Sequence, residues 1–337
     1  MASDALVDYA TDAARVAPEL CGPDCERDSP VPVRYQGVWL MYLDTLRGFW
    51  TFEEIDHSAD LAHYDALPAA QRAAVDMALS FFAGAERFVG DNLAKFLIPC
   101  VTMNEAKHFY TLQATVEHIH AVTYGNLIDA YTQHDSAKRA RLLAGITRID
   151  SVRRKGTWAQ QWTDPGVGFA DNLVAFAFVE GIMFATSFAL IYWFKKQGLL
   201  PGLGQANEQI AREETKHALF ACRQFKDFVV EKPSTEHVHA IAREAVVHEQ
   251  AFVADMLPGG GFVGLSQEAM CRYAEFVCDF WLVNMDLPPI WAHEECPLPF
   301  MDLLSAEGYT NFFERRVTEY RKGAAGAAAL DFGAQPE

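Results

Sequence analysis

The chain lacks the features that mark several common protein classes. Its 28 Lys and Arg residues are outnumbered by 45 Asp and Glu residues. The resulting formal net charge of −17 argues against a nucleic-acid-binding surface, which would be basic. No positively charged N-terminal stretch leads into a short apolar one, so we expect no secretory signal. The seven Cys residues are scattered and odd in number, which is typical of reduced thiols in a cytoplasmic protein.

Strand patterns and nucleotide-binding motifs are missing as well. Alternation of apolar and polar residues never extends beyond a few positions, so the sequence predicts an all-α fold. There is no Gly-rich phosphate loop and no catalytic cysteine set, and we therefore expect this chain to bind no nucleotide substrate itself. Cys21 and Cys25 have the spacing of a metal hook, but nothing in the sequence pairs with them.

What the chain does contain is ample material for one large core. It has 337 residues, of which 50% are hydrophobic, and long helical patterns joined by short turns favour a single helical bundle over two domains. We divide it into an N-terminal arm (1–33), a helical domain (34–321) and a flexible Gly/Ala-rich tail (322–337). We expect a tight turn at 200–204 and helices at 35–50, 69–97, 104–132, 136–148, 173–194, 205–230, 234–256, 266–285 and 311–321.

The segment VEHIHAVTY at 116–124 is the centre of the interpretation. Glu117 and His120 are three positions apart and project from the same face of a helix, with Tyr124 one turn further along. Apolar neighbours surround this set, so it faces an interior. A buried carboxylate is costly unless something pairs with it. A metal ion is one such partner, and a carboxylate with an imidazole supplies two of the ligands it needs.

Most Glu-x-x-His pairs on helices are solvated, and four occur in this chain: Glu54/His57, Glu105/His108, Glu117/His120 and Glu214/His217. A di-metal site in a ferritin-like bundle uses two such pairs and one carboxylate from each of two further helices. Glu105 lies about 120° round the helix from Glu117 and so faces elsewhere. Glu54 and His57 lie at a helix start, where Thr51 and Glu54 form a capping signal, and we expect them to be solvated.

The most apolar run, LVAFAFVEGIMFATSFALIYWF at 173–194, carries one of the lone carboxylates. Its length fits a membrane span, but a fully buried central helix agrees better with the charged, amphipathic helices around it. Glu180 lies near its middle, where an acid is expensive, so we treat it as a functional candidate. The alternative is a structural carboxylate satisfied by Ser187 or by a neighbouring helix.

The candidate ligands fall into two sets of the same order. Each set has a lone acid followed by a Glu-x-x-His pair: Asp56 with Glu117 and His120, and Glu180 with Glu214 and His217. Four carboxylates balance two divalent cations, or two trivalent ones with an oxo bridge. An oxo-bridged di-iron centre that activates dioxygen fits these ligands, and a manganese-containing centre fits them too. Zinc would be better served by thiolates or a closed tetrahedral set.

Several ordered motifs resemble one family. They are FWTFEEID (49–56), VEHIHAVTY (116–124), VAFAFVEGIMFATSF (174–188), KKQGLLPGL (195–203), NEQIAREETKH (207–217), PLPFMD (297–302) and TNFFERRVTEY (310–320). Over roughly 35–321 the chain resembles the small, radical-carrying subunit of class I ribonucleotide reductase, of the eukaryotic or viral-like type. The resemblance implies a homodimeric di-iron subunit of ribonucleoside-diphosphate reductase. With a separate large subunit, this oxidoreductase makes deoxyribonucleotides for DNA replication.

The resemblance also assigns roles to single residues. Asp56, Glu117 and His120 would hold one iron, and Glu180, Glu214 and His217 the other. Tyr124 would carry a stable tyrosyl radical, shielded by Phe184, Phe188 and Ile210. Trp39 would pass oxidising equivalents between the metal site and the surface, and Tyr320 would relay them to the large subunit. Without the resemblance, Tyr124 and Trp39 read as core aromatics and Tyr320 as a surface tyrosine at a helix end.

The sequence departs from the family pattern at two places. Glu213 stands where the family usually has the Asp that links His120 to Trp39. In the tail, Leu330, Asp331 and Phe332 resemble part of the docking peptide for the large subunit, but five more residues follow. Two other functions stay open at this point: a di-iron desaturase or oxidase acting on its own substrate, and a ferritin-like iron store.

Overall fold

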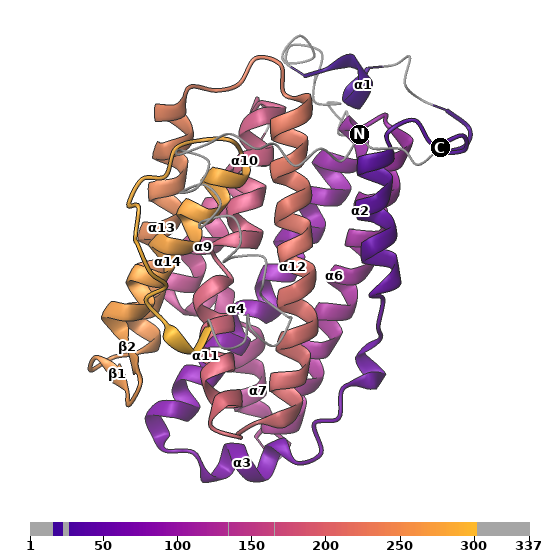
Figure 1. Cartoon of the computed structure of the whole chain (residues 1–337). Helices are drawn as coiled ribbons and strands as arrows, with labels where there is room; N and C mark the ends of the chain where they lie inside the picture. Colours follow the sequence, from indigo (N-terminus) through magenta and orange to yellow (C-terminus); the bar gives the residue numbers. More distant parts are fainter. Residues whose placement is uncertain (1–15, 23–26, 134, 165, 302–337) are drawn as a thin grey trace, which may run out of the picture.

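Residues 16–22, 27–133, 135–164 and 166–301 are described by the computed structural model of the chain (Figure 1). The fold is an all-α bundle of the ferritin-like kind, as the sequence predicts. Its larger helices are α2 (Gln36–Arg47), α4 (Ala69–Asn92), α6 (Asn104–Tyr131), α9 (Asp150–Gln161), α10 (Phe169–Gly181), α11 (Ala185–Lys196), α12 (Pro201–Phe228), α13 (Thr235–Met256) and α14 (Gln267–Asn284).

Shorter elements connect these helices. They are α1 (Pro18–Cys21), the 3₁₀ turn η3 (Phe52–Glu54), α3 (Asp60–Ala66), the π-helical η4 (Leu93–Leu97), α5 (Ile98–Cys100), α7 (Ser136–Leu143) and α8 (Gly145–Arg148). In the described part of the chain, strands are limited to the hairpin β1 (Gly261–Phe262) and β2 (Leu265–Ser266).

The apolar run forms the centre of the bundle. In the segment Phe169–Lys196, 94% of the most apolar window is buried inside the molecule. Helix α10 packs along α12, while α4 packs along α6. The run therefore buries its apolar side chains against other helices, as expected for a soluble bundle, and not against lipid.

The predicted single helix at 173–194 is in fact two helices, α10 and α11. The carbonyl oxygen of Phe178 accepts hydrogen bonds from both Ile182 N (2.9 Å) and Met183 N (3.1 Å), so the helical ladder slips by one residue. The chain regains helical geometry only at Ala185. This break, Ile182–Phe184, follows directly after the turn that carries Glu180.

The segment 200–204 is the start of α12 and not the separate turn that the sequence suggested. Leu200 has left-handed backbone geometry (φ 51°), and Pro201 then occupies the first helical position, where its missing N–H costs nothing. Buried Asp60 accepts hydrogen bonds from Gly202 N and Leu203 N, both at 2.8 Å. It thereby satisfies donors that every helix start leaves open.

Two smaller expectations are confirmed. Thr51 and Glu54 form the capping box of η3. Glu105 is buried on a different side of α6 from Glu117 and pairs with Arg27 at 2.6 Å, which ties the N-terminal segment to the start of α6. Helix α9 was missed by the sequence reasoning.

Several predictions lie outside the described residues. They are the helix at 311–321, the tail at 322–337, Tyr320 and the tripeptide at 330–332.

Candidate metal centre

Four helices bring six acidic and imidazole side chains together in the middle of the bundle. Glu86 comes from α4, Glu117 and His120 from α6, Glu180 from α10, and Glu214 and His217 from α12. Each of the six is at most 3% exposed. The side chains form two overlapping groups, and within each group one potential ligand atom per side chain lies within 4.8 Å of the others. The groups are Glu86, Glu117, His120 and Glu214, and Glu117, Glu180, Glu214 and His217.

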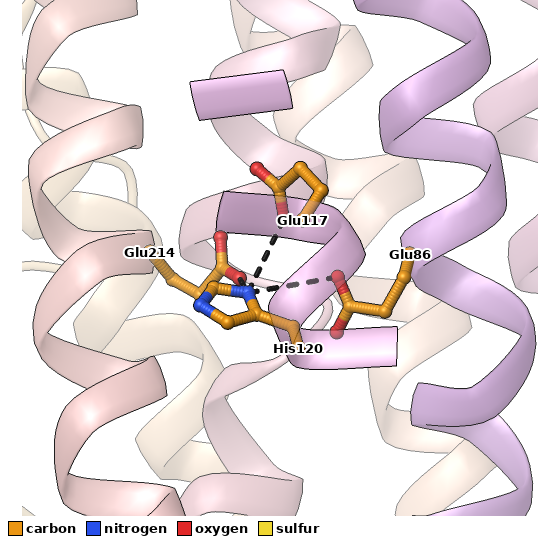
Figure 2. A group of neighbouring side chains, drawn as sticks. All are labelled: Glu86, Glu117, His120 and Glu214. Carbon is orange, nitrogen blue, oxygen red and sulfur yellow. Dashed lines mark ion pairs between the residues drawn. The ribbon is translucent and has the colours of Figure 1, made fainter. Parts of the chain in front are cut away.

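The first group is built around the imidazole of His120 (Figure 2). Its Nδ1 atom lies 2.9 Å from Glu214 Oε1, 3.3 Å from Glu117 Oε2 and 3.8 Å from Glu86 Oε2. Glu86 approaches from one side and Glu214 from the other, with Glu117 one turn before His120 on the same helix. Three carboxylates thus converge on one ring nitrogen.

The second group is built around His217. Its Nδ1 atom lies 3.1 Å from Glu117 Oε1 and 3.2 Å from Glu214 Oε2. The amide of buried Gln113 donates hydrogen bonds to Glu117 Oε1 (3.2 Å) and Glu180 Oε1 (3.0 Å). Glu117 and Glu214 therefore belong to both groups, each with one oxygen toward either histidine.

Asp56 does not belong to the site, and its assignment as a ligand is wrong. It is exposed, it follows η3 on the surface, and its carboxylate accepts a hydrogen bond from Ser58 N at 2.9 Å. Glu86 occupies the position in the cluster that the sequence analysis had assigned to Asp56. A signal for Glu86 was present in the sequence, because it is a lone acid within the apolar stretch FFAGAERFV at 81–89 of α4.

The environment of the cluster shifts the pKa values of its side chains in opposite directions. Burial raises the pKa values of Glu86 and Glu180 well above the ordinary range. Burial acts in the same direction on Glu214, but hydrogen bonds from Glu180, His120 and His217 outweigh it and lower its pKa. For His217, burial lowers the pKa, yet the charge and hydrogen bonds of Glu117 and Glu214 raise it to about 9. Metal ions bound here would displace protons from the site.

A metal fits the donor set because several buried atoms have nothing else to bind. Glu86 Oε1 and Glu180 Oε2 have no hydrogen-bond partner among the described residues, and Glu86 Oε2 has only the 3.8 Å contact with His120 Nδ1. Buried polar atoms in proteins are nearly always satisfied, and an uncompensated carboxylate is the most costly kind to leave unpaired. Mixed carboxylate and imidazole ligands suit iron or manganese.

Glu213 connects the site to a tryptophan, which is Trp50 and not the predicted Trp39. Glu213 Oε2 lies 2.8 Å from His120 Nε2 and accepts a hydrogen bond from Trp50 Nε1, also at 2.8 Å. Trp50 is buried and its ring stacks on His120 at 6.2 Å. Trp39 packs elsewhere, with ring contacts to Tyr42 and His108. Trp50 lies within the quoted motif FWTFEEID, beside the exposed Phe49.

This arrangement fixes the orientation of His120. A histidine that donates one ring N–H to a carboxylate presents the lone pair of its other nitrogen. With Nε2–H directed at Glu213, the Nδ1 lone pair of His120 faces Glu86, Glu117 and Glu214. Glu213 is therefore placed to orient His120 toward these three carboxylates.

Tyr124 lies one turn beyond His120 in an aromatic pocket. It is fully buried, and its hydroxyl has no hydrogen-bond partner among the described residues. Burial, followed by the charge of Glu86, raises its pKa well above the ordinary value. Phe82 stacks on its ring, with centroids 4.4 Å apart and planes within 3°.

Two of the residues predicted to shield Tyr124 pack against Phe82. Phe184 and Phe188 contact Phe82 at 5.8 and 5.2 Å between ring centroids. Ile210 is fully buried on α12. Phe82 itself, the direct partner of Tyr124, was missed by the sequence reasoning.

Comparisons with known proteins agree on one family. Residues 29–297 match the sequence model of "Ribonucleotide reductase, small chain". The chain is 41% identical to the ribonucleoside-diphosphate reductase subunit M2 of Danio rerio over 292 residues, covering 86% of this chain and 75% of that protein. It is 39% identical to the ribonucleoside-diphosphate reductase small chain of Vaccinia virus (strain Ankara) over 303 residues, covering 90% and 94%.

A solved structure supports the same relationship. The ribonucleotide reductase Rnr4 homodimer from Saccharomyces cerevisiae superposes with a TM-score of 0.77 at 25% identity. The match covers 93% of this chain and 96% of the yeast chain. The similarity therefore extends over the whole bundle and is not confined to the ligand motifs.

Proposed function

The chain belongs to the family of ribonucleotide reductase small chains, and from this premise we propose that its buried site holds two iron ions and that Tyr124 carries the radical used in the reaction. As a member, it is the small subunit of a ribonucleoside-diphosphate reductase, an oxidoreductase that works with a large subunit. The observation that carries the proposal is the convergence of six buried ligand side chains from four helices one turn from buried Tyr124.

In the proposed site, Glu86 and His120 would hold one ion, and Glu180 and His217 would hold the other. Glu117 and Glu214 could contribute to both, because each belongs to both groups. The ligand types also accept a manganese-containing centre, which metal analysis would reveal. When bound, ferrous ions would supply electrons that activate dioxygen, and dioxygen would supply the oxidising power.

Tyr124 would give one electron and its hydroxyl proton to the dioxygen reduced at the metal site and would keep the resulting radical. The surrounding protein must then exclude water and reductants. Phe82 covers one face of the ring, and Phe184 and Phe188 pack behind Phe82. A side chain with no exposed surface in such a pocket is protected from collision with small reductants in solution.

We propose that oxidising equivalents pass from the site through His120, Glu213 and Trp50 toward the surface. The 2.8 Å contacts on Glu213 Oε2 support this route. Tyr320 is proposed as the next relay, and the tail containing Leu330, Asp331 and Phe332 as the docking peptide for the large subunit. A homodimer is proposed by analogy with the yeast homodimer, and a cytoplasmic location from the scattered cysteines.

The test is spectroscopic. Metal-free protein is loaded with ferrous iron in air, and its optical and electron paramagnetic resonance spectra are recorded. We expect a sharp tyrosyl-radical band in the wild type and none in Tyr124→Phe, which should retain the same iron content because only a hydroxyl is lost. A radical with wild-type line shape in Tyr124→Phe would move the radical to another residue.

The same experiment addresses the two other functions. A desaturase, an oxidase or a ferritin-like store needs no stable tyrosyl radical. Family membership over residues 29–297 argues against each of them.

A further inference from the structure

A buried ion pair that the proposed radical chemistry does not use lies beside the radical pocket. Lys155 of α9 and Glu249 of α13 have no exposed side-chain surface, and their Nζ and Oε2 atoms are 2.7 Å apart. Fully buried Lys residues are rare unless they are paired. The pair therefore requires an explanation of its own.

The pair binds both ends of the break between α10 and α11. Lys155 Nζ donates a hydrogen bond to the carbonyl oxygen of Met183. Glu249 Oε1 accepts hydrogen bonds from Thr186 N (3.2 Å) and from the Thr186 hydroxyl. An interrupted helix leaves backbone donors and acceptors unpaired, and these contacts satisfy one of each kind.

The pair also contacts the aromatic wall behind Tyr124. Lys155 Nζ lies 3.4 Å from the ring centre of Phe81 and 4.0 Å from that of Phe252. Phe81 in turn contacts Phe184 (5.3 Å) and Phe82 (5.6 Å), and Phe82 stacks on Tyr124. The ammonium group is thus separated from the tyrosine by two layers of aromatic rings.

Stability alone does not explain these charges. The adjoining cavity, lined by Phe81, Lys155 and Phe184, measures about 10 Å³, at the lower limit of what one water molecule needs. Desolvation lowers the pKa of Lys155 to about 8, against the opposing charge of Glu249. A well-packed apolar pair is often as stable as a buried ion pair. What the charges add is directional bonding to Met183 and Thr186.

We propose that Lys155 and Glu249 are positioning residues for the radical site: they hold the break Ile182–Phe184 in one conformation and thereby fix Phe184 in the wall of the pocket and Glu180 on the last turn of α10. This inference rests on the proposed function, since it gives a role to residues next to the radical. Neither side chain contacts Tyr124 or the six ligand side chains in the described contacts.

The experiment compares four single variants with the wild type. Lys155→Met and Glu249→Gln remove one charge each with little change in size, and Thr186→Val removes only the hydroxyl bond to Glu249. Glu105→Gln is the matched control, because Glu105 is an equally buried carboxylate in an ion pair, with Arg27, on another side of the bundle. The readouts are radical decay with a small-molecule reductant, hydrogen exchange of residues 182–188 in metal-free protein, and thermal unfolding.

We expect Lys155→Met and Glu249→Gln to shorten the radical half-life about tenfold and to speed exchange at 182–188 by a similar factor, as for loss of a hydrogen bond to a charged group. Glu105→Gln should lower the unfolding temperature without changing either quantity. Wild-type decay and exchange in both charge variants would overturn the proposal. So would equal acceleration in Glu105→Gln, because the effect would then follow stability alone.

Thr186→Val keeps the proposal testable if the charge variants do not fold. Faster decay and exchange in this variant support positioning, and wild-type values contradict it. If the wild type forms no radical, the proposed function fails, and the exchange measurement still decides whether the pair orders the break.

Discussion

At the scale of single residues, Glu86 and Asp56 differ in their contact with water. Asp56 is solvated and bonded to the backbone of Ser58, which lowers its pKa, so a metal would have to displace favourable partners. Glu86 is buried and makes no hydrogen bond among the described residues beyond its 3.8 Å contact with His120, and a bound cation relieves that cost. This difference in solvation is the reason we propose Glu86, and not Asp56, as a ligand.

We predict that Glu86→Gln loses at least half of the bound iron, whereas Asp56→Ala binds as much as the wild type. Metal analysis after removal of free iron is the measurement. Without metal, Glu86→Gln should be at least as stable as the wild type, because it removes a buried carboxylate that makes no hydrogen bond among the described residues. The assignment would be reversed if Asp56→Ala lost metal and Glu86→Gln kept it.

A second residue-scale prediction concerns Trp50. Trp50→Phe removes the donor to Glu213 but leaves the ligands intact, so the iron content and the Tyr124 radical should persist while turnover with the large subunit falls. Trp39→Phe is the control and should retain turnover. Glu213→Ala should lower metal affinity or activity about 10–100-fold, because His120 is no longer oriented. Loss of turnover in Trp39→Phe alone would restore Trp39 to the route.

At the scale of elements, the end of α10 is packed too tightly to accept a larger residue. A Cβ atom added at Gly181 would lie 2.2 Å from Nε1 of Trp281, a fully buried side chain on α14. Gly181 follows Glu180 directly and is the last residue of α10. The absence of a side chain there lets α14 lie against the turn that presents Glu180.

We predict that Gly181→Ala lowers the free energy of unfolding by about 1–3 kcal/mol through overpacking, and that it also lowers iron occupancy by displacing Glu180. Chemical denaturation and metal analysis measure the two effects. Gly90→Ala on α4 is the control, since nothing lies within 4 Å of its added Cβ. It should raise stability by about 0.5–1 kcal/mol. If Gly181→Ala were destabilised but kept its iron content, the close packing at Gly181 would matter for stability and not for the placement of Glu180.

At the scale of the whole molecule, the bundle builds the site, and membership of the small-chain family implies a separate large subunit as its partner. The 28 residues of α6 and the 28 of α12 hold both Glu-x-x-His pairs rigidly in register. Gly/Ala-rich residues 322–337 have too little apolar bulk to add to such a core. A segment of this composition suits a docking peptide that orders on binding.

A chain ending at Lys322 is therefore predicted to keep its iron and its Tyr124 radical but to fail in ribonucleotide reduction with the large subunit. A free peptide of residues 323–337 should inhibit the intact pair, and Tyr320→Phe should assemble normally without turnover. Activity assays with the separately purified large subunit test all three. Full turnover by the truncated chain at ordinary concentrations would show that docking lies elsewhere.

The sequence by itself determined the features that depend on local spacing. Glu117 and His120, like Glu214 and His217, share a helix face because three residues span nearly one turn, and Tyr124 follows on the same face. Glu180 could be recognised because an acid inside an apolar run needs a reason to be there. The all-α fold followed from the absence of alternating patterns.

Only the tertiary structure decided which distant residues complete the site. Glu86 and Phe82 reach it from α4 and Trp50 from the segment before η3, and their roles depend on packing and burial, which no local pattern contains. The break at Ile182–Phe184 was hidden for the same reason: its backbone groups are satisfied by Lys155 and Glu249, far away in the sequence. Which side chains share a helix face is set by spacing within one turn, but which side chains are buried and which groups they bind is set by the whole fold.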